Sequence, residues 1–419
     1  MFRKLVSVEE AQKLLDQNFT PKPLGIETVS LSEAHGRVLA VDIVSPFDVP
    51  PFDRSTVDGY AVKADDTFSA DEDRPVSLEF CGKVNVGEIP KIRVKRGMAA
   101  EIVTGAPIPE GADAAVMMED TVRNGDTILV HTSVSKAENV MRAGSDIHKG
   151  QTVLKKSVLL SSGEIGILAA VGAAKVKVYK RPKVAVISTG AEIVEPGKRL
   201  PPRKIYDINA HTLSAAVVEC GGEPLIMGII QDKANQMKSA LNEALTVADM
   251  VITSGGVSVG PTDLIPKVLD TLGKPGVIVY GIAIKPGKPT TMAIINGKPV
   301  FSLPGHPTSS LLTFHLFVKP VLAKMAGKPE EKPITVKAVT SEKFFSARGR
   351  RTCVTITLKR DKTGKTVAYP VPTDASGAIT TLSKADGFIE IHESQQFVDA
   401  GETVTVYLFK PEIYYSLMS

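Results

Sequence analysis

The chain has no tryptophan, and only 5% of its residues are aromatic. It also lacks an excess of charge, since 50 basic residues face 46 acidic ones and leave a formal net charge of +4. Proteins that bind nucleic acids typically follow the phosphates with a strongly basic surface and stack the bases on aromatic rings. Neither feature is present, so we expect no nucleic-acid partner.

Cysteine is scarce as well. Cys81, Cys220 and Cys353 are odd in number and far apart, which fits neither a disulfide framework nor a zinc site. The seven histidines form no HxH or HExxH pair, which also argues against zinc. The chain contains no P-loop, no nucleophile elbow and no GxGxxG, and the last absence argues against a dinucleotide oxidoreductase. A reducing cytoplasm suits this cysteine usage.

Long apolar runs are missing from the first residues, MFRKLVSVEEAQKLL. We therefore expect neither a signal peptide nor a membrane span there. Ser7, followed three residues later by Glu10, instead predicts a helix that starts with a capping box. The apolar stripe of this helix is Val8, Ala11, Leu14 and Leu15. We expect a cytoplasmic protein without membrane contact.

The length of 419 residues predicts roughly three domains of ~150 residues. Residues 45–145 are rich in Val, Ile, Gly and Pro with frequent turn signals, which predicts a small β-rich module. The apolar helical pattern SSGEIGILAAVG follows, and we expect this segment to pack with the start of the chain. The predicted domains are an N-terminal linker domain (1–44 and 146–178), an inserted β-rich domain (45–145), an α/β domain (179–328) and a C-terminal β-barrel domain (329–419).

From Lys183 onward, strand-like and helix-like segments alternate. VAVIST, PLIMGII, DMVITS and VFSLPG read as strands, and the helices are expected around 210–220, 234–245, 262–272 and 308–326. Repeated βα units predict an open, mostly parallel sheet. Ligands bind at the carboxyl ends of the strands in such sheets, so the loops after these strands share one candidate site. After Pro329 only strand patterns follow.

The segment ADMVITSGGVSVGPTD (248–263) is the most informative of these loops. A strand, a glycine-rich loop and a helix start allow backbone N–H groups to approach a phosphate closely. Asp263 would repel a bare phosphate, so it predicts a bridging divalent cation such as Mg²⁺. The alternative is a plain strand-to-helix turn, in which Asp263 only complements the helix dipole.

Other loops after strands carry polar residues too. Hydroxyls and glycines suit phosphate, carboxylates suit a metal and lysines suit an oxyanion. Lys285 and Lys288 lie in a rigid Pro/Gly loop, although a single lysine is more often a solvated surface charge. These loops contain Ser188 to Glu192, Gln231 and Asp232, Ser254 to Asp263, Ile284 to Pro289, and Leu303 to Ser309.

These motifs resemble those of the molybdopterin molybdenumtransferase family, which includes the gephyrin E domain. The resemblance covers essentially the whole chain and its motifs come in the family's order. They are PPFDRSTVDGYAV (50–62), RAGSDI (142–147), ISTGAEI (187–193), IYDIN (205–209), GIIQD (228–232), SGGVSVGPTD (254–263), IAIKPGKP (282–289) and LPGHPTSS (303–310). A further match is EIVTGAPIPEGADAAV (101–116).

The resemblance implies an elongated homodimer of four-domain subunits and a late step of molybdenum cofactor synthesis. Adenylated molybdopterin and molybdate enter, the molybdenum cofactor and AMP leave, and Mg²⁺ is required. It also implies transient contact with a molybdopterin adenylyltransferase and with acceptor molybdoenzymes.

The resemblance assigns roles to individual residues. Asp58, Asp146 and Asp263 become candidates for catalysis, the first two by facing the sheet domain of the other subunit. Glu192, Asp232 and Asp263 would hold Mg²⁺ at the pyrophosphate. The substrate-binding set is Thr104, Ser188, Thr189, Gly190, Asp207, Ser254, Gly255, Gly256, Ser258, Lys285, Lys288, Pro304, Pro307, Ser309, Arg350 and Ser376. Within it, Lys285, Lys288, Ser309, Arg350 and Ser376 match positions that would bind molybdate.

Three positions depart from the family pattern. His306 stands where Asn is usual, Ile208 where a hydroxyl is common, and Cys353 where an aromatic residue is frequent. A tungstate-preferring relative or a non-catalytic pterin-binding scaffold therefore remains an alternative. A pterin nucleotide adenylyltransferase is a further rival, but it would lack the β-rich insertion and the C-terminal barrel.

Overall fold

A computed structural model describes residues 5–256, 264–330, 332–371, 380–409 and 412–414. The chain forms two compact units. The first holds residues 1–27, 36–40 and 178–419, and the second holds residues 28–35 and 41–177.

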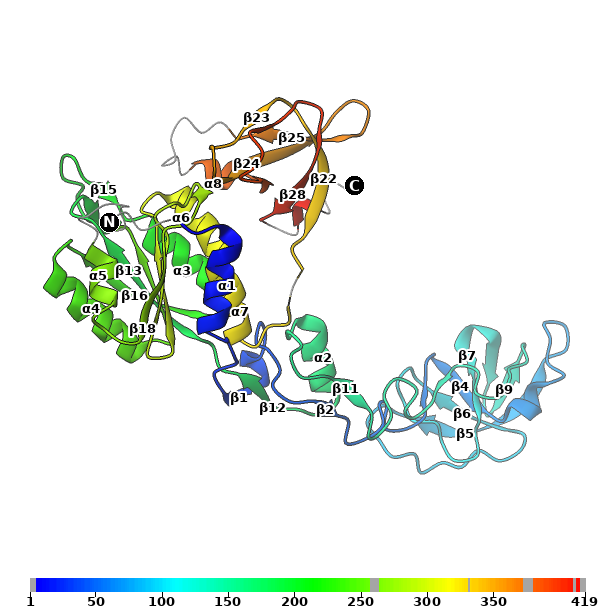
Figure 1. Ribbon diagram of the computed structural model, residues 1–419. Coiled ribbons are helices and arrows are strands. Elements are labelled where there is room, and N and C mark those ends of the chain that lie inside the picture. The colour runs from blue at the N-terminus through cyan, green and yellow to red at the C-terminus, as the bar shows by residue number, and fades with distance from the viewer. Residues whose placement is uncertain (1–4, 257–263, 331, 372–379, 410–411, 415–419) are drawn as a thin grey trace. The chain divides into compact units, whose positions relative to one another are not determined.

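The first unit contains a central six-stranded sheet (Figure 1). Its order is β16 (Glu223–Ile230), β13 (Lys183–Thr189), β17 (Met250–Ser254), β21 (Lys298–Leu303), β20 (Thr291–Ile295) and β18 (Pro275–Tyr280). The first four strands pair in parallel, and β20 pairs antiparallel with both β21 and β18, so that β20 alone runs in the opposite direction. The expected mostly parallel sheet is therefore present.

Helices cover both faces of this sheet. Along β13, Val184 and Val186 belong to one core with α3 (Asn209–Glu219), whereas Ala185 and Ile187 belong to a second core with α4 (Ala234–Val247). Successive side chains of a strand point to opposite faces, which explains this alternation. Burial on both faces explains why these strands read as continuous apolar runs.

The remaining helices of this sheet differ slightly from expectation. α5 (Leu264–Leu269) is shorter than the predicted 262–272 helix, whose first residues lie outside the described part of the chain. The predicted 308–326 helix consists of α6 (Pro307–Thr313), a π-helical segment (Phe314–Val318) and α7 (Lys319–Met325). π-helical turns inside α-helices widen the helix locally and are frequent at functional sites.

The N-terminal helix α1 (Val8–Asn18) begins where the sequence predicts. The Ser7 hydroxyl accepts a hydrogen bond of 3.1 Å from the N–H of Glu10. Ala11 and Leu15 are buried, and Val8 and Leu14 pack against the same core as α3. The amphipathic stripe therefore attaches α1 to the central sheet domain.

The C-terminal part of the first unit is a closed five-stranded barrel, as expected. β24 (Arg351–Arg360), β25 (Thr366–Pro370), β22 (Thr335–Thr340), β28 (Thr403–Leu408) and β26 (Gly387–Ile391) follow one another, and β24 pairs with β26 to close it. The short strand β19 (Ile284–Lys285) adds to β24 in parallel. The smaller elements are β14 (Ile193–Val194), β15 (Ile205–Tyr206), β23 (Phe344–Phe345), β27 (Phe397–Val398) and α8 (Thr380–Lys384).

The second unit is built on another six-stranded sheet. Its order is β7 (Ala114–Met117), β4 (Gly59–Val62), β6 (Met98–Ile102), β5 (Val76–Val84), β9 (Thr127–Val130) and β8 (Thr121–Asn124). The pairs β3 (Arg54–Ser55) with β10 (Val140–Met141) and β2 (Ile43–Val44) with β11 (Thr152–Leu154) join segments on either side of it in sequence. Helix α2 spans Ser162–Ala170, and 3₁₀ turns span Leu31–Glu33, Ala64–Thr67 and Met118–Asp120.

Residues 1–44 and 146–178 share a further strand pair, β1 (Ile26–Ser30) with β12 (Lys175–Tyr179). The three cysteines are free thiols. In the described part of the chain, no helix has the length and apolar character that a membrane crossing needs.

Candidate functional site

Four parallel strands of the central sheet end at one edge, and we call the described residues of the loops that follow them the rim. In register, Ser188 lies beside Ser254, Thr189 beside Ile230, and Ser254 beside Leu303. Ser188, Thr189 and Ser254 are each 1% exposed, so the strand ends themselves are buried. The polar loops that the sequence singled out thus start side by side at the carboxyl ends of the strands, where ligands of such sheets bind.

The loops after β13 and β17 approach each other so closely that glycine is required. Gly255 has φ +89°, and a Cβ atom there would lie 2.3 Å from the carbonyl oxygen of Thr189. Gly256 has φ +64°, and its Cβ would lie 2.6 Å from the Thr189 hydroxyl. A side chain at either position would clash with the backbone or the hydroxyl of the neighbouring loop. The two glycines keep the Thr189 hydroxyl and the loop backbone within reach of one ligand.

Asn209 connects two rim loops by hydrogen bonds. It was not among the site residues predicted from the sequence. Its Nδ2 donates a 2.7 Å hydrogen bond to the Ser254 hydroxyl and another of 2.7 Å to the carbonyl oxygen of Gly305. The side chain is buried, with 8% of the residue exposed. The motif IYDIN contains this asparagine, and its place in the first turn of a helix that starts at the rim was the signal available.

Asp207, which the sequence assigned to substrate binding, caps a helix. Its Oδ1 accepts a 3.0 Å hydrogen bond from the N–H of Ala210 at the start of α3. Ile208, between the capping residue and the helix, leaves the helix start without a hydroxyl of its own. Asp207 therefore already compensates for the missing hydroxyl in part, because a carboxylate is a strong cap for the first N–H groups.

Glu192 and Asp232 form an acidic pair at the rim. The pKa of Asp232 is raised, first by burial and then by the negative charge of Glu192. Gly190 brings the Glu192 carboxylate close to the chain, since a Cβ there would lie 2.9 Å from its Oε2. A Cβ on Gly256 would lie 3.5 Å from Asp232 Oδ1, so the acidic pair adjoins the glycine loop.

Such a pair has the chemistry of a magnesium site. Hard divalent cations prefer carboxylate oxygens, and a cation would relieve the repulsion by Glu192, which is the second cause of the raised pKa of Asp232 after burial. Asp263, the third predicted ligand, and Ser258 lie outside the described residues. Within the described residues no group of three or more His, Cys, Asp or Glu side chains gathers around a common point. Two carboxylates of the predicted trio thus come together.

Several residues predicted to bind an oxyanion lie in or beside the proline-rich loop 284–289. Lys285 pairs with Thr352 where β19 runs beside β24, which brings it near Arg350. A Cβ on Gly287 would lie 2.6 Å from Cγ2 of Thr313, whose hydroxyl donates a 2.8 Å hydrogen bond to the carbonyl oxygen of Ser309. Lys288 follows directly after Gly287. The proline-rich loop therefore packs on the helix that carries Ser309.

The positive side chains of this group have no carboxylate partner within the described part of the chain. Lys285 is exposed, and Lys288 and Arg350 are half-buried. None of the three forms an ion pair with a described residue. Cations that the protein leaves without a carboxylate partner favour a small anion. Ser376, the last residue predicted for this group, lies outside the described residues.

The loop after β21 closes the rim. Pro304 and Pro307 are buried, and Pro307 is the first residue of α6. His306 is exposed and precedes the helix with extended backbone angles. Cys353 is 6% exposed in the core beside α3, and burial raises the pKa of its thiol. Cys353 is therefore a packing residue of β24 and not part of the rim.

The remaining predicted residues lie in the second unit. Asp58 Oδ1 accepts hydrogen bonds from the N–H of Thr104 at 2.7 Å and from its hydroxyl at 3.0 Å. These bonds lower the pKa of Asp58, although the side chain is exposed. Asp146 is exposed on a separate turn and donates its backbone N–H to the carbonyl oxygen of Val49.

Comparison with protein families gives three matches along the chain. The MoeA N-terminal region (domain I and II) matches residues 6–172. A probable molybdopterin binding domain matches residues 185–324, and the MoeA C-terminal region (domain IV) matches residues 337–409.

Full-length relatives agree with these matches. A molybdopterin molybdenumtransferase of Haemophilus influenzae is 35% identical over 405 residues, which is 96% of this chain and 98% of the relative. One of Bacillus subtilis is 35% identical over 92% of this chain and 90% of the relative. A crystal structure of a molybdopterin biosynthesis MoeA protein from Pyrococcus horikoshii superposes with a TM-score of 0.83 at 45% identity and covers 97% of this chain and 100% of that one.

Proposed function

The chain belongs to the molybdopterin molybdenumtransferase family, and we propose that its rim holds adenylated molybdopterin and molybdate together while metal is inserted and AMP is released. The activity of this family is a transferase step of molybdenum cofactor biosynthesis. The adenylated substrate, the release of AMP and the need for Mg²⁺ are the parts that we add.

One observation carries the proposal: the acidic pair of Glu192 and Asp232 adjoins a loop that only glycine can build. Burial, and then repulsion by Glu192, raises the pKa of Asp232, and a divalent cation would relieve that repulsion. The close approach of Gly255 and Gly256 to Thr189 brings two loop backbones and the Thr189 hydroxyl together, and we propose that phosphate oxygens bind there. A pyrophosphate with its cation needs these two kinds of group side by side.

The protein's own residues divide the work on the substrates. Thr189, Gly255 and Gly256 hold and orient the phosphates, and Asn209 keeps the loops after β17 and β21 at a fixed spacing. Lys285, Lys288, Ser309 and Arg350 receive the oxyanion. Fixed cations stabilise a dianion without reorganising when it binds.

Mg²⁺ fits the donor set of Glu192, Asp232 and Asp263. When bound, it would neutralise the negative charge that accumulates on the departing phosphate. We propose the homodimer that the family resemblance implies, with Asp58, Thr104 and Asp146 of one subunit serving the rim of the other. We also propose the four domains with the bounds predicted from the sequence, and the cytoplasm as the compartment.

The test is an assay with purified protein, adenylated molybdopterin, Mg²⁺ and either molybdate or tungstate. We expect AMP release together with cofactor formation, because the rim supplies both a pyrophosphate site and an oxyanion site. No AMP with either oxyanion would reduce the protein to a pterin-binding scaffold. Faster turnover with tungstate would instead favour a tungstate-preferring member, which the exposed His306 beside the oxyanion group makes a specific second candidate.

Two substitutions test the proposed Mg²⁺ ligands. Asp263→Ala and Glu192→Gln should each abolish AMP release while the fold persists, since each removes a carboxylate from the cation. Glu243→Gln is the matched control, because this exposed glutamate lies on α4 away from the rim. Turnover of Asp263→Ala equal to that of the control would refute the metal role.

A further inference from the structure

Arg351 stands at the junction of three elements in the first unit. Its backbone N–H donates a 2.9 Å hydrogen bond to the carbonyl oxygen of Ala283, which starts the pairing of β24 with β19. Through that pairing Ile284 lies opposite Arg351 and Lys285 opposite Thr352. The position of Lys285 therefore depends on where the first residues of β24 are held.

The turn before Arg351 is fixed by the same strand start. The Thr352 hydroxyl accepts a 2.8 Å hydrogen bond from the N–H of Ala347 and donates one of 3.3 Å to the carbonyl oxygen of Arg350. The N–H of Arg350 also donates to the carbonyl oxygen of Ala347 at 3.0 Å. Arg350 thus lies in a turn that is closed by hydrogen bonds and is followed directly by Arg351.

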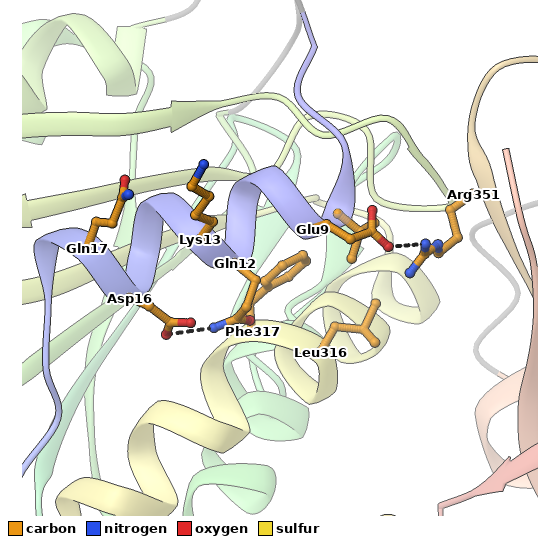
Figure 2. A pocket seen from close by; sticks show the side chains of 9 residues that line it. Glu9, Gln12, Lys13, Asp16, Gln17, Leu316, Phe317 and Arg351 are labelled. Carbon is orange, nitrogen blue, oxygen red and sulfur yellow. Dashed lines mark hydrogen bonds and ion pairs between the residues drawn. The ribbon is translucent and has the colours of Figure 1, made fainter.

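The Arg351 side chain is surrounded by three carboxylates. It forms an ion pair with Glu9 of α1, and its guanidinium lies 3.6 Å from Glu390 and 3.7 Å from Glu393. Figure 2 shows the Glu9 carboxylate and the Arg351 guanidinium turned toward each other at one end of a groove along α1. The Arg351 side chain is 13% exposed, whereas the Glu9 side chain is 58% exposed.

Arg351 and Arg350, its neighbour in sequence, therefore differ in their charge surroundings. Glu9 accepts a hydrogen bond from the Arg351 guanidinium, and Glu390 and Glu393 form longer ion pairs with it. Arg350 and Lys285 form no ion pair with any described residue and remain open to an anion. Arg350, in the turn, and Arg351, the first residue of β24, thus have opposite surroundings: the protein neutralises Arg351 and leaves Arg350 for a ligand.

We propose that Arg351 is a positioning residue of the oxyanion site, which clamps the start of β24 between α1 and β26 and thereby sets Arg350 and Lys285. This inference depends on the proposed function, because it assumes that Arg350 and Lys285 receive the oxyanion. Without Arg351, the carboxylates of Glu9, Glu390 and Glu393 repel one another across the junction. The pairing with β19 then loosens, and the two cations lose their common spacing.

Loss of Arg351 should leave the proposed pyrophosphate-binding loops of the rim unchanged. Thr189, Gly255 and Asn209 are held by contacts among β13, β17 and α3, and none of these contacts includes β24. A general loss of folding would affect both ends equally. Weaker oxyanion binding with unchanged pterin binding therefore distinguishes a positioning role from a merely structural one.

The experiment compares the wild-type protein with Arg351→Ala, Arg351→Lys and Arg360→Ala. Arg360 is the matched control, since it is an exposed arginine at the other end of β24. The Michaelis constants for molybdate and for adenylated molybdopterin are measured separately, and molybdate binding is measured by calorimetry. For Arg351→Ala we expect the molybdate constant to rise about tenfold and the pterin constant to stay within about twofold. Arg351→Lys should recover part of the loss, because it keeps the charge but not the fork.

Each outcome decides the matter. Unchanged molybdate affinity in Arg351→Ala, or an equal rise of both constants, overturns the inference. If the wild-type protein turns nothing over, the proposed function fails, and calorimetry alone judges Arg351. Weaker molybdate binding in Arg351→Ala than in Arg360→Ala then still supports the positioning role. Absence of molybdate binding in the wild-type protein overturns it as well.

Discussion

At the residue scale, single side chains set the electrostatics of the predicted catalytic groups. The Asp58 carboxylate is exposed, yet its pKa lies below the usual aspartate value because Thr104 donates two hydrogen bonds to it. A carboxylate with a lowered pKa in the folded state contributes stability above the pKa of the unfolded state. That contribution is lost as the pH falls through the folded pKa.

Replacing Thr104 by valine tests this hydrogen-bonded pair. Thr104→Val removes the hydroxyl donor and keeps the backbone donor, so the pKa of Asp58 should move part of the way back up. Carbon NMR of the aspartate carboxyls reports the pKa, and urea unfolding should show a stability loss at neutral pH that vanishes in acid. Thr56→Val, at an exposed threonine nearby, should change neither. An unshifted Asp58 would contradict the account.

Asn209 is the second residue whose removal has a defined consequence. Asn209→Ala leaves the buried Ser254 hydroxyl and the Gly305 carbonyl without their donor, so we expect the free energy of unfolding to fall by about 1–3 kcal/mol. Substrate binding should weaken as well, since two rim loops lose their tie. Urea denaturation measures the stability, with Asn242→Ala on the exposed side of α4 as control. Equal stability of the two variants would show that the tie is unimportant.

At the element scale, the π-helical segment between α6 and α7 carries a half-buried histidine. His315 contacts the rings of Phe314 and Phe409, with ring centroids 6.0 Å and 5.5 Å away. Burial, and then the charge of Lys319, lowers its pKa to about 4. His315 lines a cavity together with Glu219 and Glu412. These two carboxylates would favour the charged ring, but burial has the larger effect on the pKa of His315.

Acid should therefore weaken the packing of this segment. The unfolded chain protonates histidine near pH 6.5 and the folded chain only near pH 4, so the unfolded state binds more protons between these values. The free energy of unfolding should fall as the pH drops through that window, and His315→Gln should flatten the dependence. Denaturation at several pH values measures it, with the exposed His35→Gln as control. The same slope in the His315 and His35 variants would be incompatible with a neutral half-buried ring.

At the scale of the whole molecule, the proposed homodimer makes each site depend on two subunits. Asp58→Asn and Glu192→Gln should each be inactive alone, because each spoils every site of its own dimer. In co-expressed protein that pairs at random, half of the dimers are mixed and each mixed dimer has one intact site, so about a quarter of wild-type activity should return. AMP release from the mixture measures this recovery.

The same mixing experiment has an internal control. Asp232→Asn and Glu192→Gln come from one rim, so their mixture should stay inactive. Recovery there, or none with the Asp58 pair, would rule out sites shared between subunits.

Much of the fold could be predicted because its signals are local. Strands buried on both faces read as apolar runs, and Ser7 with Glu10 marks the start of α1. The break of the 308–326 helix into α and π segments was not predictable from periodicity, since it depends on how Phe314 and Phe317 pack in the core. The roles of Asn209 and Arg351 were missed for a related reason: their partners are far away in sequence.

The sequence by itself determined which residue types follow each strand of the central sheet, because strand and loop patterns are set within a few neighbours. It thereby determined that hydroxyls, glycines, carboxylates and lysines would be available at one edge. Only the tertiary structure decided their partners: Asn209 with Gly305, Lys285 beside the barrel strand, and Arg351 among three carboxylates. The physical reason is that these contacts join segments up to 342 residues apart, whose meeting depends on packing of the whole unit.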